Sequence, residues 1–219
     1  MKFEEGIYPI YKPRGWSSFQ VVNFVKKSSG IRCVGHGGTL DPLGEGVLVV
    51  AVGRKFTRQL TQILKNSCKE YVAEILLDRK SDSYDVDGNV CKVEVKKVPA
   101  REQIENTLKM FIGEIEQLPP VYSAIKIKGK RACDIVRKNK DMVEKVKQLI
   151  KPKKVVISGL EVIEYVFPKL RLKICCSSGF YVRSLANDLG ERLGCGGVVS
   201  YLLRTKVNDF KVEDCIKII

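Results

Sequence analysis

The sequence predicts an α+β protein in which helices cover the faces of a mixed sheet. Apolar and polar residues alternate over 69–77 and again over 169–176, which is the period of a half-buried strand. Apolar residues three or four apart, followed by glycine, indicate helices over 18–27 and 100–112. Strands and helices mix without the strict β-α-β alternation of a doubly wound fold, so a mixed sheet is the expected architecture.

The other elements complete this layout. We expect strands over 7–11, 47–52, 90–95, 155–166 and 198–203, and helices over 57–65, within 126–154 and through Leu185, Leu189 and Leu193. Residues 85–89 favour a turn, which predicts a hairpin between 69–77 and 90–95. Ser17 or Ser18 caps the first helix, which should turn Phe19, Val22 and Val25 inward.

The charge is strongly positive and unevenly placed. The 219 residues include 39 Lys and Arg against 25 Asp and Glu, a net charge of +14, which favours a polyanionic partner. Residues 126–154 hold twelve of the cations and three of the acids, so nine net charges lie in one segment. A phosphate-binding surface explains this cluster better than solubility does, with a solvated helical face as the alternative.

Length, cysteines and the N-terminus restrict the class of protein. A chain of this length with 44% apolar residues suits one globular domain. Eight cysteines without a C-x-x-C pair, and a single histidine, predict free thiols, no metal site and a reducing compartment. Without a signal peptide or a long apolar run, we expect an intracellular protein of the cytoplasm or nucleus, with an organelle as an open alternative.

Residues 35–48 are the leading candidate for a functional loop. They contain the only histidine, His36, five glycines, and Asp41 directly before a proline. Glycine permits close approach to a ligand, and a residue before proline is kept out of the helical region. Asp41 is therefore the lead candidate for a reactive group, and an ordinary Asp-Pro turn is an equally weighted alternative.

Four other residues could act together with Asp41. His36 lies in the same loop, Tyr71 lies near a strand start, and Tyr181 and Arg183 follow a glycine turn. A desolvated aspartate must be paired, and this arginine is well placed to supply the charge. The alternatives are a satisfied loop histidine, core tyrosines and a surface arginine.

Seven motifs follow one another along the chain. They are IYPIYKPRGWSS over 7–18, HGGTLDPLGEG over 36–46, KEY over 69–71, DSYDVDG over 82–88, PVYSAIK over 120–126, SGFYVR over 178–183 and LGCG over 193–196. Together they resemble the TruB family of pseudouridine synthases, enzymes that isomerise a uridine in the tRNA T-loop. The resemblance covers essentially the whole chain.

The resemblance implies a fold and a reaction. The fold is that of the pseudouridine synthases, a central mixed and mainly antiparallel sheet flanked by helices. The reaction is isomerisation of the uridine at tRNA position 55 by base flipping, cleavage of the glycosidic bond and reattachment through carbon. No cofactor and no metal are implied.

The resemblance also assigns roles to individual residues. Asp41 matches the catalytic carboxylate, Tyr71 the residue that stacks on the flipped base and is a candidate for handling a proton, and Arg183 the arginine that pairs with the aspartate. Other matches are expected to contact the substrate or the RNA: Tyr181 and Leu202 in the pocket, His36 at the flipped-out loop, and Lys12 in the first motif. Residues 124–154 match an inserted segment that clamps the T-arm, in which lysines such as Lys126, Lys128 and Lys130 would meet phosphates.

The chain departs from the family pattern in two places. Leu43 is followed by Gly44 and Glu45, where bacterial members usually carry a small residue and then Thr or Ser. We also expect no PUA-type domain, which many relatives carry after these motifs. We therefore expect one catalytic domain over 1–219 with no separate C-terminal RNA-binding domain, acting as a monomer on the tRNA T-arm without an obligate protein partner.

Two alternatives to a stand-alone enzyme are retained. One is the same chemistry inside a guide-RNA complex of the dyskerin type, whose members carry extensions that this sequence lacks. The other is a non-catalytic chaperone that binds and refolds tRNA elbows. The presence of Asp41, Tyr71 and Arg183 together argues against the second.

Overall fold

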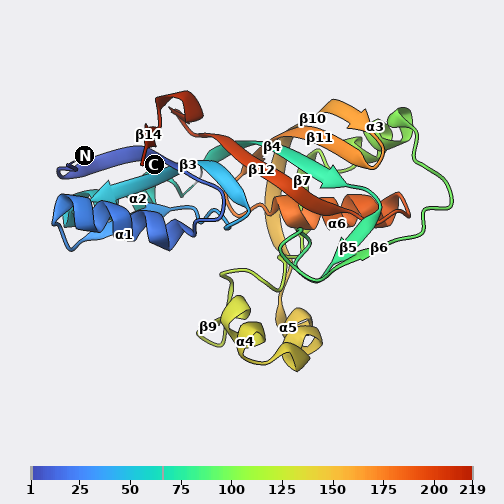
Figure 1. Cartoon of the computed structure of the whole chain (residues 1–219), viewed down its shortest axis with the longest axis horizontal. Coiled ribbons are helices and arrows are strands. Elements are labelled where there is room, and N and C mark those ends of the chain that lie inside the picture. The colour runs from blue at the N-terminus through green and yellow to red at the C-terminus, as the bar shows by residue number, and fades with distance from the viewer. Residues whose placement is uncertain (1, 66, 219) are drawn as a thin grey trace. The chain divides into compact units, whose positions relative to one another are not determined.

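The computed structural model describes residues 2–65 and 67–218, which form two compact units (Figure 1). The first unit consists of the residues up to 73, residues 173–178 and the residues from 201 onward, and the second consists of 74–172 and 179–200. The described strands of the main sheet follow the order β14-β1-β3-β12-β4-β11-β10-β7. Three of them, β4 (Cys68–Leu76), β11 (Lys169–Ser177) and β12 (Val198–Val207), contribute residues to both units.

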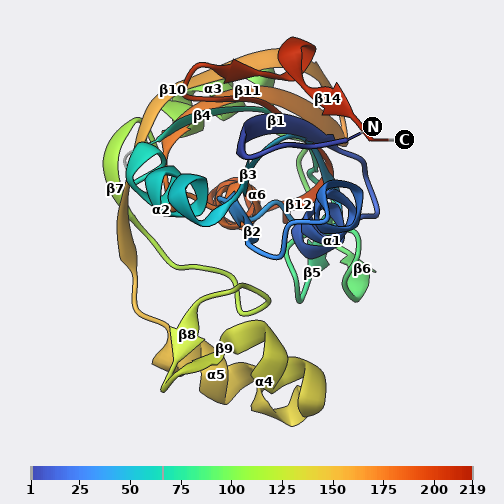
Figure 2. The same cartoon turned by 90° about the vertical axis from the view of Figure 1, so that its left-hand side faces the viewer.

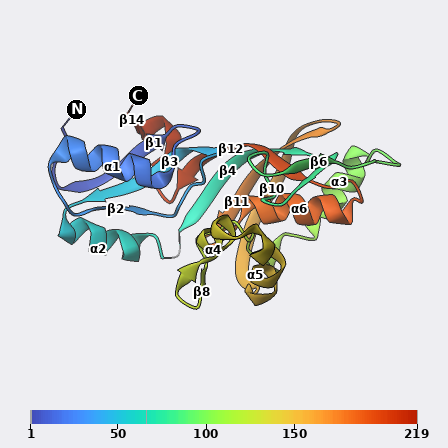
Figure 3. The same cartoon turned by 60° about the horizontal axis from the view of Figure 1, so that its bottom comes forward.

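The first unit is built around a strand that is buried on both faces. β3 (Gly44–Val52) pairs antiparallel with β1 (Gly6–Lys12) and with β2 (Val34–Gly37), and parallel with β12. Its even-numbered residues 48, 50 and 52 pack with α1 (Ser18–Ser29), and its odd-numbered residues 47, 49 and 51 pack with α2 (Arg54–Ile63). Figure 3 shows the two helices on opposite sides of these strands. A helix on each face explains why β3 is apolar at consecutive positions.

Short C-terminal elements complete the first unit. β13 (Phe210–Lys211) pairs antiparallel with β12, η2 spans Val212–Asp214, and β14 (Ile216–Lys217) pairs parallel with β1. Among the strand pairs whose direction is determined, antiparallel pairs outnumber parallel ones. The prediction of a mixed, mainly antiparallel sheet flanked by helices is thus confirmed.

Helix α1 confirms the predicted caps but corrects one inward residue. Ser17 caps it in a capping box with Gln20, and Gly30 ends it with a φ of 72°. Phe19, expected inside, is 66% exposed, and Val21 is fully buried instead. The reason lies at Ser18, whose hydroxyl is buried and exchanges hydrogen bonds with the backbone of Leu40 at 2.8 and 2.9 Å. This contact turns Ser18 inward, and the adjacent Phe19 points outward.

In the second unit, β10 (Lys153–Val166) pairs antiparallel with β7 (Gly113–Gln117). Helix α3 (Arg101–Lys109) buries Ile104 and Leu108 as predicted, and α6 (Val182–Arg192) buries Leu185 and Leu189. The predicted hairpin between 69–77 and 90–95 is wrong. β6 (Val90–Lys92) pairs with β5 (Arg79–Ser81), since β4 is followed at once by a turn into β5 and is flanked in the sheet by β12 and β11.

The basic segment forms a small lobe with its own core (Figure 2). Its elements are β8 (Lys126–Ile127), β9 (Lys130–Arg131), α4 (Ala132–Lys138), η1 (Lys140–Met142) and α5 (Val143–Leu149). Apolar residues of 121–150 bury one another, with Ala132 and Val136 fully enclosed. All twelve Lys and Arg of 126–154 are exposed. Nine of them lie between residues 126 and 147, on the outside of the folded lobe, and Lys153 and Lys154 belong to β10.

None of the helices in the described part of the chain combines the length and the apolar character needed to cross a membrane.

Candidate active site

The loop that carries Asp41, residues 38–43, is held from inside the first unit by Arg204 of β12. The Arg204 side chain is 1% exposed. Its Nε donates to the carbonyl of Val47 at 2.7 Å, its Nη2 to Gly38 at 3.0 Å and its Nη1 to Thr39 at 3.5 Å. One planar guanidinium therefore fastens both the beginning of the loop and the strand that follows it.

Lys12 holds the other end of the loop. Its ammonium is fully buried and donates to the carbonyls of Pro13 at 2.9 Å, Trp16 at 2.5 Å and Pro42 at 3.5 Å. The backbone N–H of Gly15 adds a 2.8 Å hydrogen bond to the same Pro42 carbonyl. Burial lowers the pKa of Lys12 to about 8, against the opposing charge of Asp41. Lys12 thus fixes the loop through its contact with the Pro42 carbonyl. Its predicted contact with RNA stays a prediction.

Tyr71 and Lys69 project from the same face of β4 in the first unit, because they are two residues apart on a strand. Tyr71 is 6% exposed, and burial raises the pKa of its hydroxyl, while the charge of Arg204 and a hydrogen bond to Arg204 act in the opposite direction. The charge of Asp41 also acts on this hydroxyl. The charges of Arg204 and Asp41 therefore both act on the Tyr71 hydroxyl.

His36 and Leu202 flank the same loop. His36 lies on β2, beside a cavity of about 290 Å³ between residues 35–38 and one side of α2. Its Nδ1 is buried without a hydrogen-bond partner in the described part of the protein, and burial, followed by the charge of Arg204, lowers its pKa. Leu202 is 6% exposed and pairs in register with Gly44, next to the end of the loop. The first unit thus brings Asp41, Tyr71, His36, Lys12 and Leu202 together around one loop.

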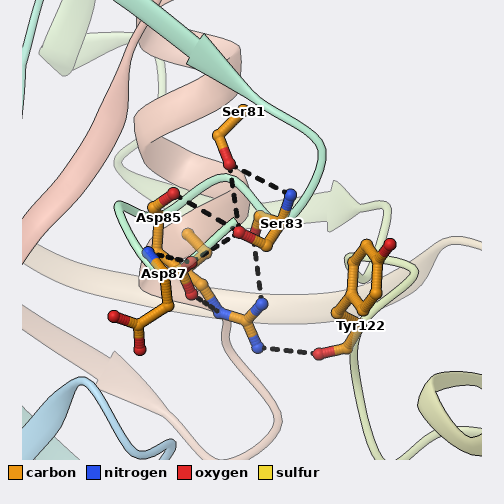
Figure 4. Close-up of polar contacts among 6 residues, drawn as sticks. Ser81, Ser83, Asp85, Asp87 and Tyr122 are labelled. Atoms are coloured by element: carbon orange, nitrogen blue, oxygen red, sulfur yellow. Dashed lines mark hydrogen bonds and ion pairs between the residues drawn. The ribbon is translucent and has the colours of Figure 1, made fainter. Parts of the chain in front are cut away.

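Arg183 lies in the second unit and binds a tight acidic turn there, whose residues Ser83 and Asp85 are labelled in Figure 4. Its Nε forms an ion pair with Asp85 at 3.5 Å, both side chains being less than 10% exposed, and its Nη1 donates to the Ser83 carbonyl at 3.0 Å. Its Nη2 donates to the carbonyl of Tyr122 at 3.0 Å. The arginine is thus a buried anchor and not a surface residue. Its predicted pairing with Asp41, which belongs to the other unit, stays a prediction.

The turn over residues 81–89 is organised by its own side chains. The Ser83 hydroxyl donates to Asp85 at 2.5 Å and accepts a hydrogen bond from the Ser81 hydroxyl at 3.0 Å. Asp85 also accepts from the backbone N–H of Asp87 at 3.2 Å. A side chain at Gly88 would lie 2.2 Å from the Ser83 hydroxyl, so only glycine fits there. The DSYDVDG motif therefore serves to present Asp85 to Arg183.

Tyr181 is the N-cap residue directly before helix α6 and is fixed by Gln117, the last residue of β7. Gln117 is 2% exposed and makes two hydrogen bonds with the backbone of Tyr181. Ser184 donates a 2.7 Å hydrogen bond to the carbonyl of Leu118. Together with the bond from Arg183 to Tyr122, these contacts tie the first turn of α6 to residues 117–122.

Sequence patterns alone missed two residues of the first unit. Lys69 stands in the KEY motif, but neither the motif nor the strand pattern predicted a function for it. Arg204 lies one residue beyond the expected end of the last strand. The available signal was the strand period, because Arg204 shares a face with Leu202 and the expected strand continues past residue 203. A charged residue on a buried strand face usually has a specific partner.

Comparison with known proteins identifies the family. The model of the TruB family pseudouridylate synthase N-terminal domain matches residues 26–182, and that of the tRNA pseudouridylate synthase B C-terminal domain matches residues 183–218. A tRNA pseudouridine synthase B of Bacteroides fragilis is 40% identical over 223 residues, which cover 99% of this chain and 92% of that protein. One of Protochlamydia amoebophila is 42% identical over 212 residues, covering 97% of this chain and 78% of that protein.

Solved structures give the same result for the fold. A chain from the "Crystal Structure of a Cbf5-Nop10-Gar1 Complex" matches with a TM-score of 0.72 and 32% identity, covering 97% of this chain and 52% of that one. This chain therefore spans about half the length of that structural relative. The fold, the seven motifs and both family models agree along its length, and this chain belongs to the TruB family of pseudouridine synthases.

Proposed function

We propose that this protein is a tRNA pseudouridine synthase that isomerises the T-loop uridine at position 55, with Asp41 as its catalytic carboxylate. One observation carries the proposal. Asp41 stands on a loop whose two ends are fixed by the buried cations Arg204 and Lys12, and its charge reaches the Tyr71 hydroxyl. Relatives about 40% identical over nearly the whole chain are named tRNA pseudouridine synthase B, which supports the choice of tRNA.

The reaction needs a carboxylate on a rigid support. The bond between N1 of uracil and C1′ of the ribose breaks, the base turns over, and a bond forms between C5 and C1′. The proton lost from C5 and the one gained at N1 balance, so the product is an isomer and no cofactor takes part. Asp41 acts on the sugar, either as a nucleophile at C1′ or as a base at C2′. A fixed loop keeps its carboxylate in one orientation during both bond changes.

The detached uracil must be retained until it is reattached. In this proposal Tyr71 stacks on the flipped base, and Leu202 and Tyr181 line the pocket that keeps water out. His36 takes part in holding the RNA loop in its flipped-out form. A buried, largely neutral imidazole suits contact with a base better than contact with a phosphate. Arg183 supplies the positive charge that neutralises Asp41 when substrate covers the site.

The basic lobe is proposed to grip the T-arm. Its nine exposed cations, among them Lys126, Lys128 and Lys130, lie on a folded lobe that residues 117–122 connect to the first turn of α6. Binding through phosphates gives affinity and orientation without reading the base sequence. We propose that the protein acts inside the cell as a monomer, without a guide RNA or a protein partner.

The test uses the purified full chain and an unmodified tRNA transcript, without added protein, guide RNA or metal. Pseudouridine is mapped by carbodiimide modification and primer extension, and its amount is followed by tritium release from C5-labelled uridine. The proposal expects one modified site, position 55, and one tritium released per tRNA. Modification that requires a guide RNA or a protein partner would favour the dyskerin-type alternative, and binding without release would favour the chaperone.

A further inference from the structure

Lys69 is a largely buried residue whose ammonium has no anionic partner within the part of the chain that the structure describes. Lys69 is the second residue of β4 and is 8% exposed. Within the described residues its Nζ makes neither a hydrogen bond nor an ion pair. The other buried cations of the first unit differ, since the charged groups of Lys12 and Arg204 each donate to three backbone carbonyls. Burying an uncompensated charge is unfavourable, so such a group calls for a ligand.

Among the described residues, the ionisable neighbours of Lys69 add positive charge from Arg204 and, near neutral pH, no negative charge. A side chain built on Gly38 would lie 3.4 Å from the Nζ of Lys69 and 3.8 Å from the Nη1 of Arg204. The other ionisable neighbour is the thiol of Cys176, whose pKa burial raises to about 12, so it carries no charge near neutral pH. Burial, with the charge of Arg204, lowers the pKa of Lys69 to about 8. An anion bound beside the ammonium would favour its charged form and so offset this lowering of the pKa.

Gly38 makes the ammonium accessible to a large ligand. Gly38 is exposed and has a φ of +71°, a conformation that side chains rarely adopt. A Cβ built on Gly38 would contact the Nζ and Cε of Lys69 at 3.4 and 3.5 Å, so a side chain here would crowd the ammonium, and glycine leaves that space free. Asp41 follows three residues later on the same loop.

We propose that Lys69 binds a phosphodiester of the RNA substrate, on the 5′ or 3′ side of the uridine that enters the site. This inference rests on the proposed function. Tyr71, proposed to stack on the base, lies two residues along the same face of β4, so Lys69 is displaced from the base along the strand and faces the RNA backbone. The phosphodiester is the anion that every RNA offers at that place, and an ammonium beside a glycine suits it.

Lys69 thereby orients the nucleotide that reacts with Asp41. A contact to a phosphate does not depend on the base sequence of the RNA, but it fixes the position of the sugar relative to the Asp41 carboxylate. The basic lobe binds phosphates over the wider T-arm, whereas Lys69 binds one phosphate at the reacting nucleotide.

The test is a binding cycle between Lys69 and single phosphates. A T-arm RNA carries an uncharged methylphosphonate 5′ or 3′ of the target uridine, and the adjacent 2′-hydroxyl is replaced by hydrogen in both the modified and the control RNA. Wild type, Lys69→Met and Lys69→Arg are compared, with the exposed Lys211→Met as a matched control. Because Kd is the readout, the test also works with RNA that cannot react.

One of the two methylphosphonates should weaken wild-type binding ~10- to 100-fold, the range for loss of a charged hydrogen bond. Lys69→Met should bind the control RNA more weakly than wild type by a similar factor. The same methylphosphonate should weaken RNA binding by Lys69→Met almost no further. Lys69→Arg and Lys211→Met should keep the wild-type phosphate effect. Since Lys69→Met removes an uncompensated charge, its Tm should not fall.

Two results would overturn the inference. The first is that wild type binds both methylphosphonate RNAs as tightly as their controls, which decides the question even if Lys69→Met does not fold. The second is that the same methylphosphonate weakens RNA binding by Lys69→Met as much as it weakens binding by wild type. Failure of the proposed function is distinguishable, because it would show as no pseudouridine formed by wild type on all-phosphate tRNA.

Discussion

The side-chain amide of Gln117 exchanges two hydrogen bonds with the backbone of Tyr181. Its Oε1 accepts from the Tyr181 N–H at 2.8 Å, and its Nε2 donates to the Tyr181 carbonyl at 3.0 Å. Gln117 thus acts as a short piece of strand that fixes the residue before α6. Arg183 follows two residues later, so the same contact helps to fix the backbone position from which the Arg183 side chain extends.

Replacement of Gln117 by Leu should therefore impair both stability and turnover. The Tyr181 backbone would lose two hydrogen bonds, while its carbonyl still accepts from the Leu185 N–H at 3.2 Å, so the expected cost is about 1–3 kcal/mol in all. Gln117→Glu should also be destabilised, because a carboxylate can accept from the N–H but cannot donate to the carbonyl. Urea unfolding and single-turnover tritium release measure the two effects, with the exposed Gln103→Leu as control. Wild-type behaviour of Gln117→Leu would refute this role.

Arg204→Met should destabilise the protein by about 3 kcal/mol or more, because three carbonyls around the Asp41 loop lose a donor at once. Arg204→Lys should rescue little, since one ammonium cannot span the carbonyls of Val47 and Gly38 as a planar fork does. Thermal unfolding measures the loss, and Arg58→Met on the exposed side of α2 is the matched control. A Tm for Arg204→Met within 1 °C of wild type, which corresponds to about 0.25–0.5 kcal/mol, would contradict the anchoring role.

The basic lobe should determine how RNA affinity depends on salt. Replacing Lys126, Lys128 and Lys130 by Gln should weaken tRNA binding and lower the slope of log K against log salt by about 2 to 3, because each phosphate contact contributes about 0.7–0.9. The rate at which bound tRNA is converted to product should change little. The control triple, with Gln at 92, 96 and 97, removes three exposed lysines outside the lobe. Equal slopes for the two triples would mean that the lobe does not bind phosphates.

Lys12 should make stability depend on pH in the alkaline range. Its pKa is about 8 in the folded protein, where it faces Asp41, Glu45 and Arg204, and 10.5 when exposed. Between these values the unfolded chain binds more protons, so the contribution of Lys12 to stability rises with pH. The free energy of unfolding of wild type relative to Lys12→Met should therefore increase from pH 8 to 10.5. Urea titrations over this range test the sign, and a constant or shrinking difference would contradict it.

Local signals predicted the fold well, and contacts between distant residues did not follow from them. Ser17 and Gly30 delimit α1 because capping is a local property. Phe19 faces solvent because Ser18 binds Leu40, a contact 22 residues away that helical spacing does not contain. β6 pairs with β5 for a similar reason, since alternation identifies a strand but does not name its partner.

The candidate site shows the same division. Asp41, His36 and Lys12 fall in two motifs that the chain places around one loop, as the pattern indicated. Arg204, which joins the Asp41 loop to β12, is 163 residues from Asp41, and nothing in the local sequence of either announces the contact. The Asp85 partner of Arg183 stands in a recognised motif, but its acidic turn reads locally as a solvent-exposed loop.

The most direct test of the account compares wild type with Asp41→Asn on C5-tritiated, unmodified tRNA, measuring tritium release and tRNA affinity in the same preparation. Asn keeps the size of the side chain and removes the carboxylate. The account predicts no detectable release from Asp41→Asn, with a Kd within about threefold of wild type and an unchanged Tm. Tritium release by Asp41→Asn at the wild-type rate would contradict a catalytic role, and joint loss of release, binding and folding would make Asp41 a structural residue of the loop.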